Sequence, residues 1–284
     1  MEEFSLVTVA IPVYNAEKYI ALAISSVLSH TYKNFELIIT DDGSDDNTLA
    51  IIELFNDSRI KLFSDGENRG ISFRLNQQID LAKGKYFVRM DADDIMFPDR
   101  LKCQISFLES HLDIDVIGAS AIVIDENNKI IGKREFKEGR IKSFIHPTIS
   151  GRLEWFKKYK YRNEYKGSED FELWVRSSRY SKMHNFTEPL LFYRDPLCFN
   201  IKTYRFRQKQ TRCICRYYMQ KNKSNIDFFL RLYVRSFLMD AVALIFSFLK
   251  CDKFIISKRN ISIPLSDMDR YKEILANIID DVHN

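Results

Sequence analysis

Apolar and polar positions follow two different periods along the first part of the chain. Short runs rich in β-branched and aromatic residues predict buried strands, and longer stretches with apolar residues three or four apart predict amphipathic helices. Strands that alternate with helices are typical of a parallel sheet covered on both faces. The predicted strands cover residues 6–12, 35–41, 60–64 and 85–90, and the predicted helices cover 16–29, 46–55, 71–82 and 99–111.

The pattern changes further along the chain. Two apolar stretches, 116–124 and 129–136, flank the sequence DENN and predict a β-hairpin. A helix is expected to begin after Ser168 as N-cap, because acidic residues occupy its first turn. Short strands are predicted at 183–186 and 190–193, and the chain from Lys202 onward is predicted to be mostly helical.

Composition and charge add one asymmetry to this picture. At 284 residues, with 45% hydrophobic and 29% charged residues, the chain is an ordinary folded protein of one large domain, or of a domain with an appendage. The net charge of +4 is uneven, because residues 197–250 contain eleven Lys or Arg against Asp227 and Asp240. A local basic surface indicates an anionic partner, such as nucleic acid, acidic lipid or a phosphorylated substrate.

The basic segment is expected to form one face of a helix. A strongly apolar segment, 225–250, follows it, but charged residues interrupt that segment before it reaches the ~18 uncharged apolar residues that a transmembrane helix needs. It is either a buried core helix or a helix lying on a membrane, and the adjacent cations favour the membrane surface. The predicted basic stripe consists of Arg205, Lys209, Arg212 and Arg216.

The start of the chain, MEEFSLVTVAIP, is acidic and continues directly into the first predicted strand. It does not show the basic and apolar regions of a signal peptide. The five cysteines form no CxxC pair, so free thiols in a reducing cytoplasm are expected.

Two acidic clusters are the most informative feature of the sequence. Asp41 and Asp42 lie at the end of one predicted strand, and Asp91 and Asp93 follow another. Ligands of open α/β sheets bind at this edge, where the strands end. Carboxylates gathered there repel one another unless a cation lies between them, which indicates Mg²⁺ or Mn²⁺ bridging to a diphosphate. For either cluster alone, an ordinary turn with a helix N-cap is the alternative.

Three common nucleotide and hydrolase motifs are missing from the sequence. It contains no GxGxxG of a dinucleotide-binding site, no GxxxxGK[ST] of a P-loop and no GxSxG of an α/β-hydrolase. Of the nucleotide-binding sites considered, the one that the sequence still allows is a metal-assisted site without a glycine-rich phosphate loop.

Several motifs, in order, resemble those of the family 2 glycosyltransferases, which are inverting enzymes of the GT-A fold. The resemblance is to the bacterial branch that builds lipopolysaccharide, O-antigen or capsule. It implies an α/β GT-A domain with a mostly parallel sheet over residues 1–200 and a helical C-terminal region over 201–284. The motifs are AIPVYNAEKYI, DDGSDD, ENRGISFRLN, MDADDI, HPTISGRLEWF, GSEDFELWVR and LLFYR.

The resemblance also implies roles for single residues. Asp93 would hold Mn²⁺ or Mg²⁺, which offsets charge on the departing UDP diphosphate. Asp170 would be the general base that takes the proton from the acceptor hydroxyl. Nucleotide binding is implied for Pro12, Tyr14, Asn15, Glu17, Asp42, Arg74, Asn76 and Asp91, and a place on the acceptor or diphosphate side for His146, Glu169, Trp174 and Arg194.

The acceptor-side assignments each have a structural alternative. Glu169 and Asp170 would also suit a helix start simply as acids near the positive end of the helix dipole. His146 is either functional or a loop histidine, and Trp174 is either a core residue or a cleft wall. Arg194 binds diphosphate or pairs with a surface acid.

One position departs from the family pattern. Many members have a His two residues after the YR of LLFYR that helps to hold the metal, whereas this chain has Pro196 there. Asp195, His146 or water would have to complete the site, or the metal would be held by Asp93 and the diphosphate alone.

We expect an inverting transferase that moves a sugar from a UDP-sugar to a glycan hydroxyl. The resemblance implies an acceptor on polyprenyl diphosphate at the inner face of the membrane, where residues 202–250 would bind the anionic surface. Nucleic acid is not expected, because no nucleic-acid module is recognisable. One alternative is a sugar-nucleotide nucleotidyltransferase, although VYNAEKY contains none of the glycines of its phosphate loop. Another is a non-catalytic scaffold, against which the intact DAD and SED runs argue.

Overall fold

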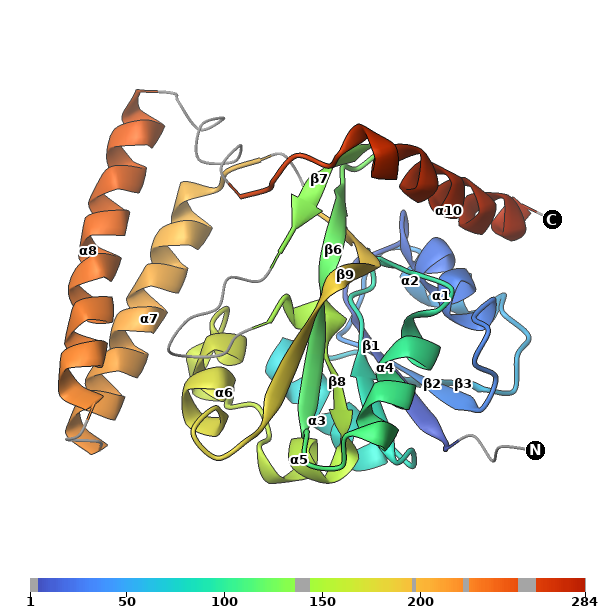
Figure 1. Ribbon diagram of the computed structural model, residues 1–284, viewed down its shortest axis with the longest axis horizontal. Helices are drawn as coiled ribbons and strands as arrows, with labels where there is room; N and C mark the ends of the chain where they lie inside the picture. Colours follow the sequence, from blue (N-terminus) through green and yellow to red (C-terminus); the bar gives the residue numbers. More distant parts are fainter. Residues whose placement is uncertain (1–4, 136–143, 196–197, 222–224, 250–258, 284) are drawn as a thin grey trace.

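The computed structural model describes residues 5–135, 144–195, 198–221, 225–249 and 259–283, with the backbone alone for 281–283 (Figure 1). Its strands form a nine-stranded sheet. They are β1 (Val7–Val13), β2 (Phe35–Asp41), β3 (Ile60–Ser64), β4 (Tyr86–Arg89), β5 (Ile95–Met96), β6 (Val116–Ile124), β7 (Ile130–Arg134), β8 (Ser150–Arg152) and β9 (Met183–Arg194).

Helices pack on both faces of this sheet, and two of them extend to one side of it (Figure 1). They are α1 (Ile20–Leu28), α2 (Thr48–Glu53), α3 (Ile71–Leu81), α4 (Arg100–Ser110), α5 (Leu153–Lys158), α6 (Glu169–Ser177), α7 (Ile201–Lys221), α8 (Ile226–Phe248) and α10 (Leu265–His283), with 3₁₀ turns η1 (His146–Thr148) and η2 (Asn163–Tyr165).

The sheet order is β3-β2-β1-β4-β8-β6-β9-β5, with β7 paired to β6. The first four strands of this order are parallel, β8 is antiparallel to both of its neighbours, and β6 and β9 are parallel. The sheet is therefore mostly parallel, as expected. Because β1, β2 and β4 point the same way, their carboxyl ends meet at one edge.

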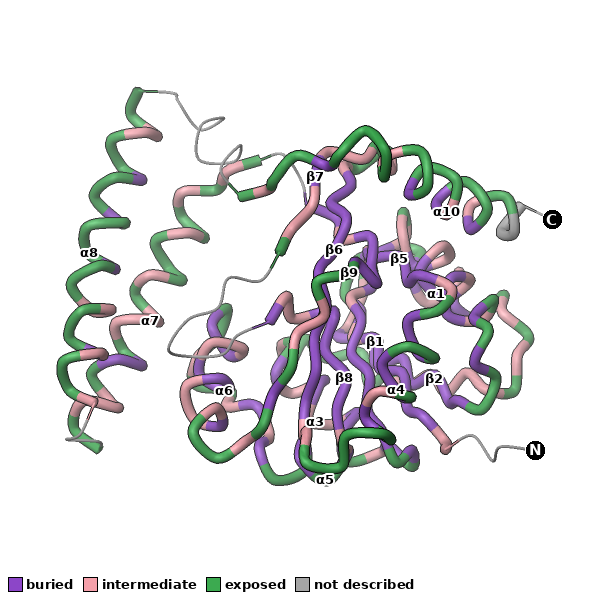
Figure 2. The backbone as a smooth tube through the Cα atoms, viewed as in Figure 1, coloured by how far each residue is buried: buried purple, intermediate pink, exposed green. Residues whose placement is uncertain are grey.

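The sequences of the central strands explain their position. Nearly every residue of Val7–Val13 (VTVAIPV) and Phe35–Asp41 (FELIITD) is buried (Figure 2). Continuous apolar runs of this kind are typical of strands that are covered on both faces of the sheet. On one face Val27 and Leu101 belong to the core with α1 and α4, and on the other Leu75 and Trp155 belong to the core with α3 and α5.

The predicted elements agree with the structure where their patterns are strong, and β2, β3 and β6 have the predicted bounds. The predicted helix at 16–29 begins only at Ile20, because the preceding turn is hydrogen-bonded to the loop before α2. The two short strands predicted at 183–186 and 190–193 are one strand, β9, whose pairing with β6 shifts register near Ser120. The predicted strand 129–136 ends at Arg134, and residue 136 lies outside the described part.

The C-terminal helices divide into two groups. Helices α7 and α8 pack against each other beside α6, whereas α10 returns to the sheet and packs against α1 (Figure 1). None of the helices in the described ranges is both long and apolar enough to span a membrane. Among the described cysteines, all four are free thiols, and Cys251 lies outside the described residues. A domain boundary at residue 200 stays a prediction.

Three of the four residues of the predicted basic stripe bind partners on α8, although Arg205 and Arg216 are also exposed. Arg205 and Arg212 form ion pairs with the buried Asp240 at 3.0 and 3.3 Å. Arg216 donates to the hydroxyl of Tyr233 at 2.6 Å. These arginines hold the two helices together, since Asp240 would otherwise be an unpaired charge within their interface.

Candidate active site

An open pocket of about 270 Å³ lies where β1 and β4 end. It brings together two parts of the chain that are far apart in the sequence, the turn after β1 and the acidic turn after β4. Its lining consists of Pro12, Tyr14, Asn15, Ala16, Tyr19, Asp91, Ala92 and Asp93. Five of these residues were predicted to bind the nucleotide or the metal, and the structure places them around one space.

Hydrogen bonds to the loop before α2 fix the turn after β1. Asn15 has a positive φ of 49°, and its side-chain amide donates to Asp45 at 2.6 Å. The Ala16 N–H donates to the Thr48 hydroxyl at 2.8 Å. Glu17 accepts two hydrogen bonds from Asn47 and is not part of the pocket lining. The turn is therefore held in shape before any ligand arrives.

The two acids of the first cluster have different environments. Asp41 accepts hydrogen bonds from Gly43 N and Ser44 N and so closes the turn. Gly43 has φ +75°, and a Cβ there would lie 2.9 Å from the backbone of Glu67, so this turn requires glycine.

Asp42 instead accepts from the backbone N–H of Gly70 and from Arg74 Nε, both at 2.9 Å. Arg74 is fully buried and also binds Asp65 at 2.5 Å. Asp42 and Arg74, both predicted nucleotide ligands, thus form a buried ion pair that fixes the start of α3 against β2.

Asn76 lies further along α3 and is engaged with the segment before η2. Its amide donates to Tyr161 O at 2.9 Å and its oxygen accepts from Tyr161 N at 2.9 Å. This reciprocal pair attaches Tyr161 to α3. A role of Asn76 in nucleotide binding stays a prediction.

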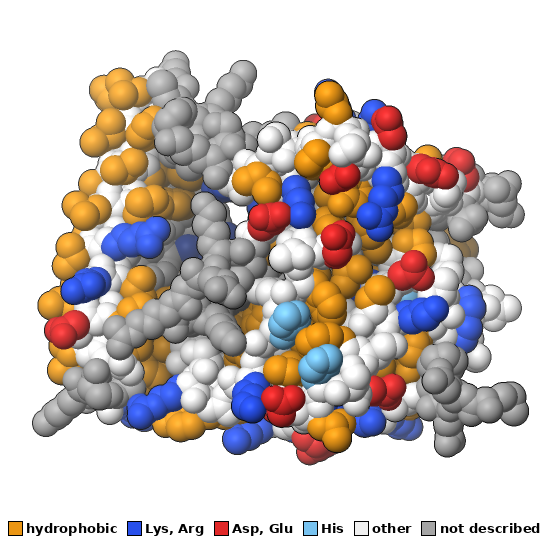
Figure 3. Space-filling view, viewed as in Figure 1, with side chains coloured by type: hydrophobic (Ala, Val, Ile, Leu, Met, Phe, Trp, Pro, Cys, Tyr) orange, Lys and Arg blue, Asp and Glu red, His pale blue; other side chains and the backbone are white. Residues whose placement is uncertain are grey.

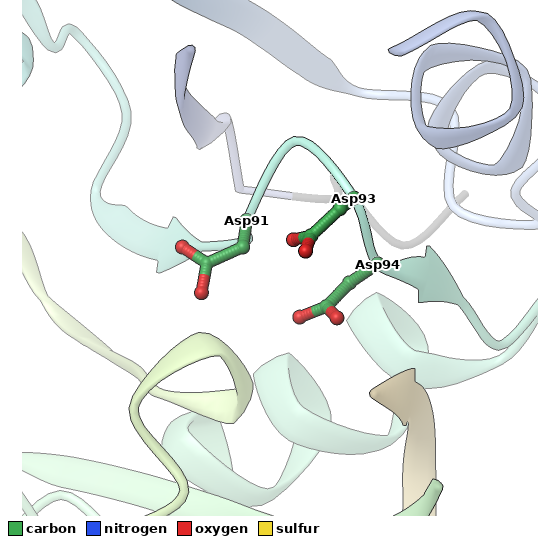
Figure 4. A group of neighbouring side chains, drawn as sticks. All are labelled: Asp91, Asp93 and Asp94. Carbon is green, nitrogen blue, oxygen red and sulfur yellow. The ribbon is translucent and has the colours of Figure 1, made fainter. Parts of the chain in front are cut away.

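Three carboxylates crowd the turn between β4 and β5. Asp91, Asp93 and Asp94 each offer an oxygen within 4.8 Å of the others, and Figure 4 shows their side chains on the same turn. Asp94 did not figure among the predicted site residues, although it adjoins the DAD run. It is 1% exposed, and its Oδ2 has no hydrogen-bond partner among the described residues.

The electrostatics of this cluster match a cation site. Burial, and then the charge of Asp91, raises the pKa of Asp93 to about 6. Burial and the neighbouring charge of Asp93 raise the pKa of Asp94 well above its ordinary value. A hard divalent ion with oxygen ligands would offset this repulsion and give Asp94 Oδ2 a partner, so the residues present fit Mn²⁺ or Mg²⁺.

The residues considered as an additional metal ligand are engaged elsewhere. Asp195 forms an ion pair with Arg134 at 2.5 Å. His146 Nε2 lies 2.8 Å from the hydroxyl of Tyr161. Pro196 lies outside the described residues. Within the described part of the chain, Asp94 is the carboxylate that joins Asp91 and Asp93.

Arg194 supports the acidic turn from behind. Its Nε donates to Asp93 O at 2.8 Å and its Nη1 donates to Asp125 O at 2.6 Å. Its guanidinium carbon lies 4.3 Å from the centre of the Tyr19 ring. The side chain is buried, and within the described part of the chain no carboxylate pairs with its guanidinium. Diphosphate binding by Arg194 stays a prediction.

The second acidic pair lies at the start of α6. The Phe171 N–H donates to Asp170 Oδ1 at 2.7 Å. Burial raises the pKa of Asp170, while the positive charges of Arg89 and Arg207 act against this rise. Burial, and then the charge of Asp170, also raises the pKa of Glu169. Ser168 is the N-cap, as predicted, but its side chain makes no capping hydrogen bond.

Arg89, which the sequence did not single out, connects the two acidic groups. Its Nη2 lies 2.5 Å from Asp91 Oδ1. It is 2% exposed, and its Nε and Nη1 have no partner among the described residues. Its charge acts on Asp93 and on Asp170 alike and counters the rise of both pKa values.

His146 and Trp174 complete this side. Burial, and then the charge of Arg89, lowers the pKa of His146 well below its ordinary value, so the ring is neutral. Trp174 is 1% exposed and packs edge-on against Phe144 with ring centres 4.8 Å apart. Trp174 is therefore a core residue next to His146. The centres of the two rings are 6.3 Å apart.

The fold and this site define a glycosyltransferase of the GT-A class. The sequence matches the model of the family described as Glycosyl transferase family 2 over residues 8–210, which is well over half of the chain. The protein therefore belongs to glycosyl transferase family 2.

Two relatives from Escherichia coli carry named activities. The O-antigen biosynthesis glycosyltransferase WbnJ is 30% identical over 205 residues, which are 66% of this chain and 79% of WbnJ. The UDP-Glc:alpha-D-GlcNAc-diphosphoundecaprenol beta-1,3-glucosyltransferase WfgD is 39% identical over 128 residues, which are 45% of this chain and 50% of WfgD.

A solved structure shows the same fold. The crystal structure of S. aureus TarS 1–349 in complex with UDP-GlcNAc matches with a TM-score of 0.66 at 20% sequence identity, covering 97% of this chain and 81% of that one. The predicted GT-A fold is thereby confirmed.

Proposed function

We propose that this chain is an inverting glycosyltransferase that moves a sugar from a UDP-sugar to a hydroxyl of a lipid-linked glycan in bacterial surface polysaccharide synthesis. One observation carries the proposal. The buried Arg89 forms an ion pair with Asp91 of the pocket, and its charge also lowers the pKa of Asp170 at the start of α6. Such a site has a place for an anionic leaving group on one side and a proton acceptor on the other.

On the donor side, Tyr14 and Asn15 would face the nucleoside in the pocket. Asp91, Asp93 and Asp94 would hold the divalent ion, which when bound supplies Lewis-acid stabilisation of the leaving diphosphate. Arg194 would keep the acidic turn in place, because it donates to Asp93 O and packs on the ring of Tyr19.

On the acceptor side, Asp170 would take the proton of the attacking hydroxyl. Burial raises its pKa, which makes the carboxylate a stronger base than an exposed one. The charges of Arg89 and Arg207 act against this rise and favour the ionised form. Attack on the face opposite the leaving group would invert the anomeric centre once.

The outward face of α8 would lie on the membrane. Exposed apolar side chains recur along it at helical spacing, and Figure 3 shows Lys or Arg side chains among hydrophobic ones over α8. Arg231 and Arg235 are exposed in this helix. A cationic and apolar helix face is complementary to an anionic bilayer surface. The apolar residues of this face are Val234, Leu238, Val242, Ile245 and Leu249.

The catalytic proposal is tested by following nucleoside diphosphate release from a panel of nucleotide sugars with Mn²⁺ or Mg²⁺. We expect one UDP-sugar to be used, with Asp93→Asn lowering release by a factor of 10² or more, since it removes a charged ligand. Asp170→Asn should lower the rate of sugar transfer to the acceptor by a similar factor. Asp113→Asn, at an exposed acid far from the site, is the control. Full activity of Asp93→Asn would refute the metal assignment, and no UDP binding at all would favour a scaffold.

Membrane binding is tested by sedimentation with phosphatidylglycerol vesicles. Leu238→Glu places a carboxylate on the outward face of α8 and should weaken vesicle binding several-fold without changing Tm. The matched control is Leu112→Glu, which alters another exposed leucine, before β6. Equal binding by both variants would rule out this face as the membrane contact.

A further inference from the structure

Helix α7 lies against the segment that leads into the proposed base. Gly167 has φ +70°, and a Cβ there would lie 3.6 Å from Phe206 Cε1 and 3.8 Å from Arg207 Cγ. Gly167 immediately precedes the N-cap Ser168 of α6. The side chains of Phe206 and Arg207 therefore lie next to the entrance of the acceptor side.

A buried carboxylate fixes α7 in this position. Glu172 on α6 is fully buried and accepts a hydrogen bond from the Tyr218 hydroxyl of α7 at 2.7 Å. Arg162 and Arg176 pair with the same carboxylate at 3.1 and 3.0 Å. Tyr218 is the member of this network that belongs to α7, so its hydrogen bond to a buried and paired carboxylate holds α7 beside α6.

Arg207 differs from the other arginines of its helix. Arg205, Arg212 and Arg216 bind partners on α8. Arg207 is exposed, and within the described ranges its guanidinium has no hydrogen-bond or ion-pair partner. Its positive charge nevertheless acts on Asp170 and lowers the pKa of that carboxyl group. A free guanidinium thus stands beside the proposed base.

We propose that Arg207, with Phe206 beside it, is the subsite that binds the diphosphate of the lipid-linked acceptor. This inference rests on the proposed function, and it names the residues that recognise the acceptor's anionic group. The planar fork of an arginine suits two phosphate oxygens at once. Phe206 is 43% exposed and offers the first carbons of the lipid an apolar surface.

The position of Arg207 favours the acceptor's diphosphate over the donor's. Arg207 lies at Gly167 and Asp170, whereas the donor pocket is lined by the turns after β1 and β4 and contains no residue of α7. The same helix pair carries the apolar face of α8. A lipid chain leaving the subsite would therefore have the proposed membrane-binding surface near it.

The subsite is tested by calorimetric titration with farnesyl diphosphate, and with farnesol as its uncharged counterpart, in the presence of saturating UDP and Mn²⁺. We expect wild-type protein to bind farnesyl diphosphate more tightly than farnesol. Arg207→Ala should weaken farnesyl diphosphate binding about tenfold or more, the usual effect of losing a hydrogen bond between charged groups, and Arg207→Lys should weaken it less. UDP affinity should stay within twofold.

Arg179→Ala is the matched control, since it removes an exposed arginine just beyond the other end of α6. Unchanged farnesyl diphosphate binding by Arg207→Ala would overturn the subsite, as would a failure of wild-type protein to bind this probe. Loss of UDP affinity instead would assign Arg207 to the donor. Donor hydrolysis by wild-type protein decides the proposed function separately, so the two failures are distinguishable.

Discussion

His30 shows how strongly one buried side chain ties folding to pH. The residue is fully buried after α1, and the backbone N–H groups of Tyr32 and Leu101 lie 3.1 and 2.9 Å from its two ring nitrogens. Protonation of the ring would place an N–H group on both ring nitrogens, each of which already lies against a backbone N–H donor. Burial, and then the charge of Arg100, lowers the pKa of His30 to about 3.

This shift makes the folded state bind fewer protons than the unfolded chain between pH 6.5 and about 3. The contribution of His30 to stability is therefore complete above pH 6.5 and decreases as the pH falls through this window. We expect the free energy of unfolding to fall by about 1 kcal/mol per pH unit more in wild type than in His30→Gln. Urea unfolding at pH 7 and pH 5 measures it, with the exposed His111→Gln as control. Parallel pH profiles would contradict the assignment.

Single residues also show what the sequence could not reveal about the site. Asp91 and Asp93 were predicted together because a motif carries them, and the pocket brings them to Tyr14. Arg89 gave no signal, because one basic residue at the end of an apolar strand has no periodicity of its own. Its importance arises from its burial beside Asp91 and from the effect of its charge on the pKa of Asp170, which is distant in the chain.

At the scale of elements, β2, β3 and β6 were predicted with their bounds, β1 and β4 were predicted to within one residue at each end, and the two shortest strands were missed. Strands β5 and β8 are only two and three residues long. Such lengths are too short to show the alternation of apolar and polar residues that predicts a strand. The apparent gap before Pro189 suggested two strands, but pairing with β6 continues past it. The spacing of the basic stripe on α7 was also correct, but only the position of Asp240 on α8 reveals which way it faces.

The contact between α6 and α7 depends on Glu172. We expect Glu172→Gln to lower the free energy of unfolding by about 2–4 kcal/mol, because two arginines lose their shared charge partner. Chemical denaturation measures the loss. Glu154→Gln breaks an exposed pair with Lys157 and should cost less than about 1 kcal/mol. Equal losses in the two variants would show that Glu172 does not anchor α7.

At the scale of the whole molecule, α10 covers the end of the sheet that carries the acidic turn. Tyr271 and Leu275 pack in one cluster with Ile95 and Phe97, which directly follow Asp94. The ring centres of Phe97 and Tyr271 are 6.1 Å apart. The C-terminal helix thus supports a site formed from the first third of the chain.

Leu275→Ala should lower the free energy of unfolding by about 2–4 kcal/mol, because it leaves a cavity in this cluster. It should also weaken Mn²⁺ binding, since β5 anchors one end of the acidic turn. The exposed Asn277→Ala on the same helix is the control for both measurements. A destabilised variant that keeps full Mn²⁺ affinity would show that α10 stabilises the fold without supporting the turn.

The same packing has a consequence for synthesis of the protein in the cell. A ribosome completes every proposed donor-side residue long before it reaches residue 265, where α10 begins. Until then Ile95 and Phe97 have no cover from this helix. A nascent chain, or a product of a message cut short, would carry the intact acidic motif and still present a poorly supported turn. Activity would thus be acquired only after α10 has been synthesised and has packed against this cluster.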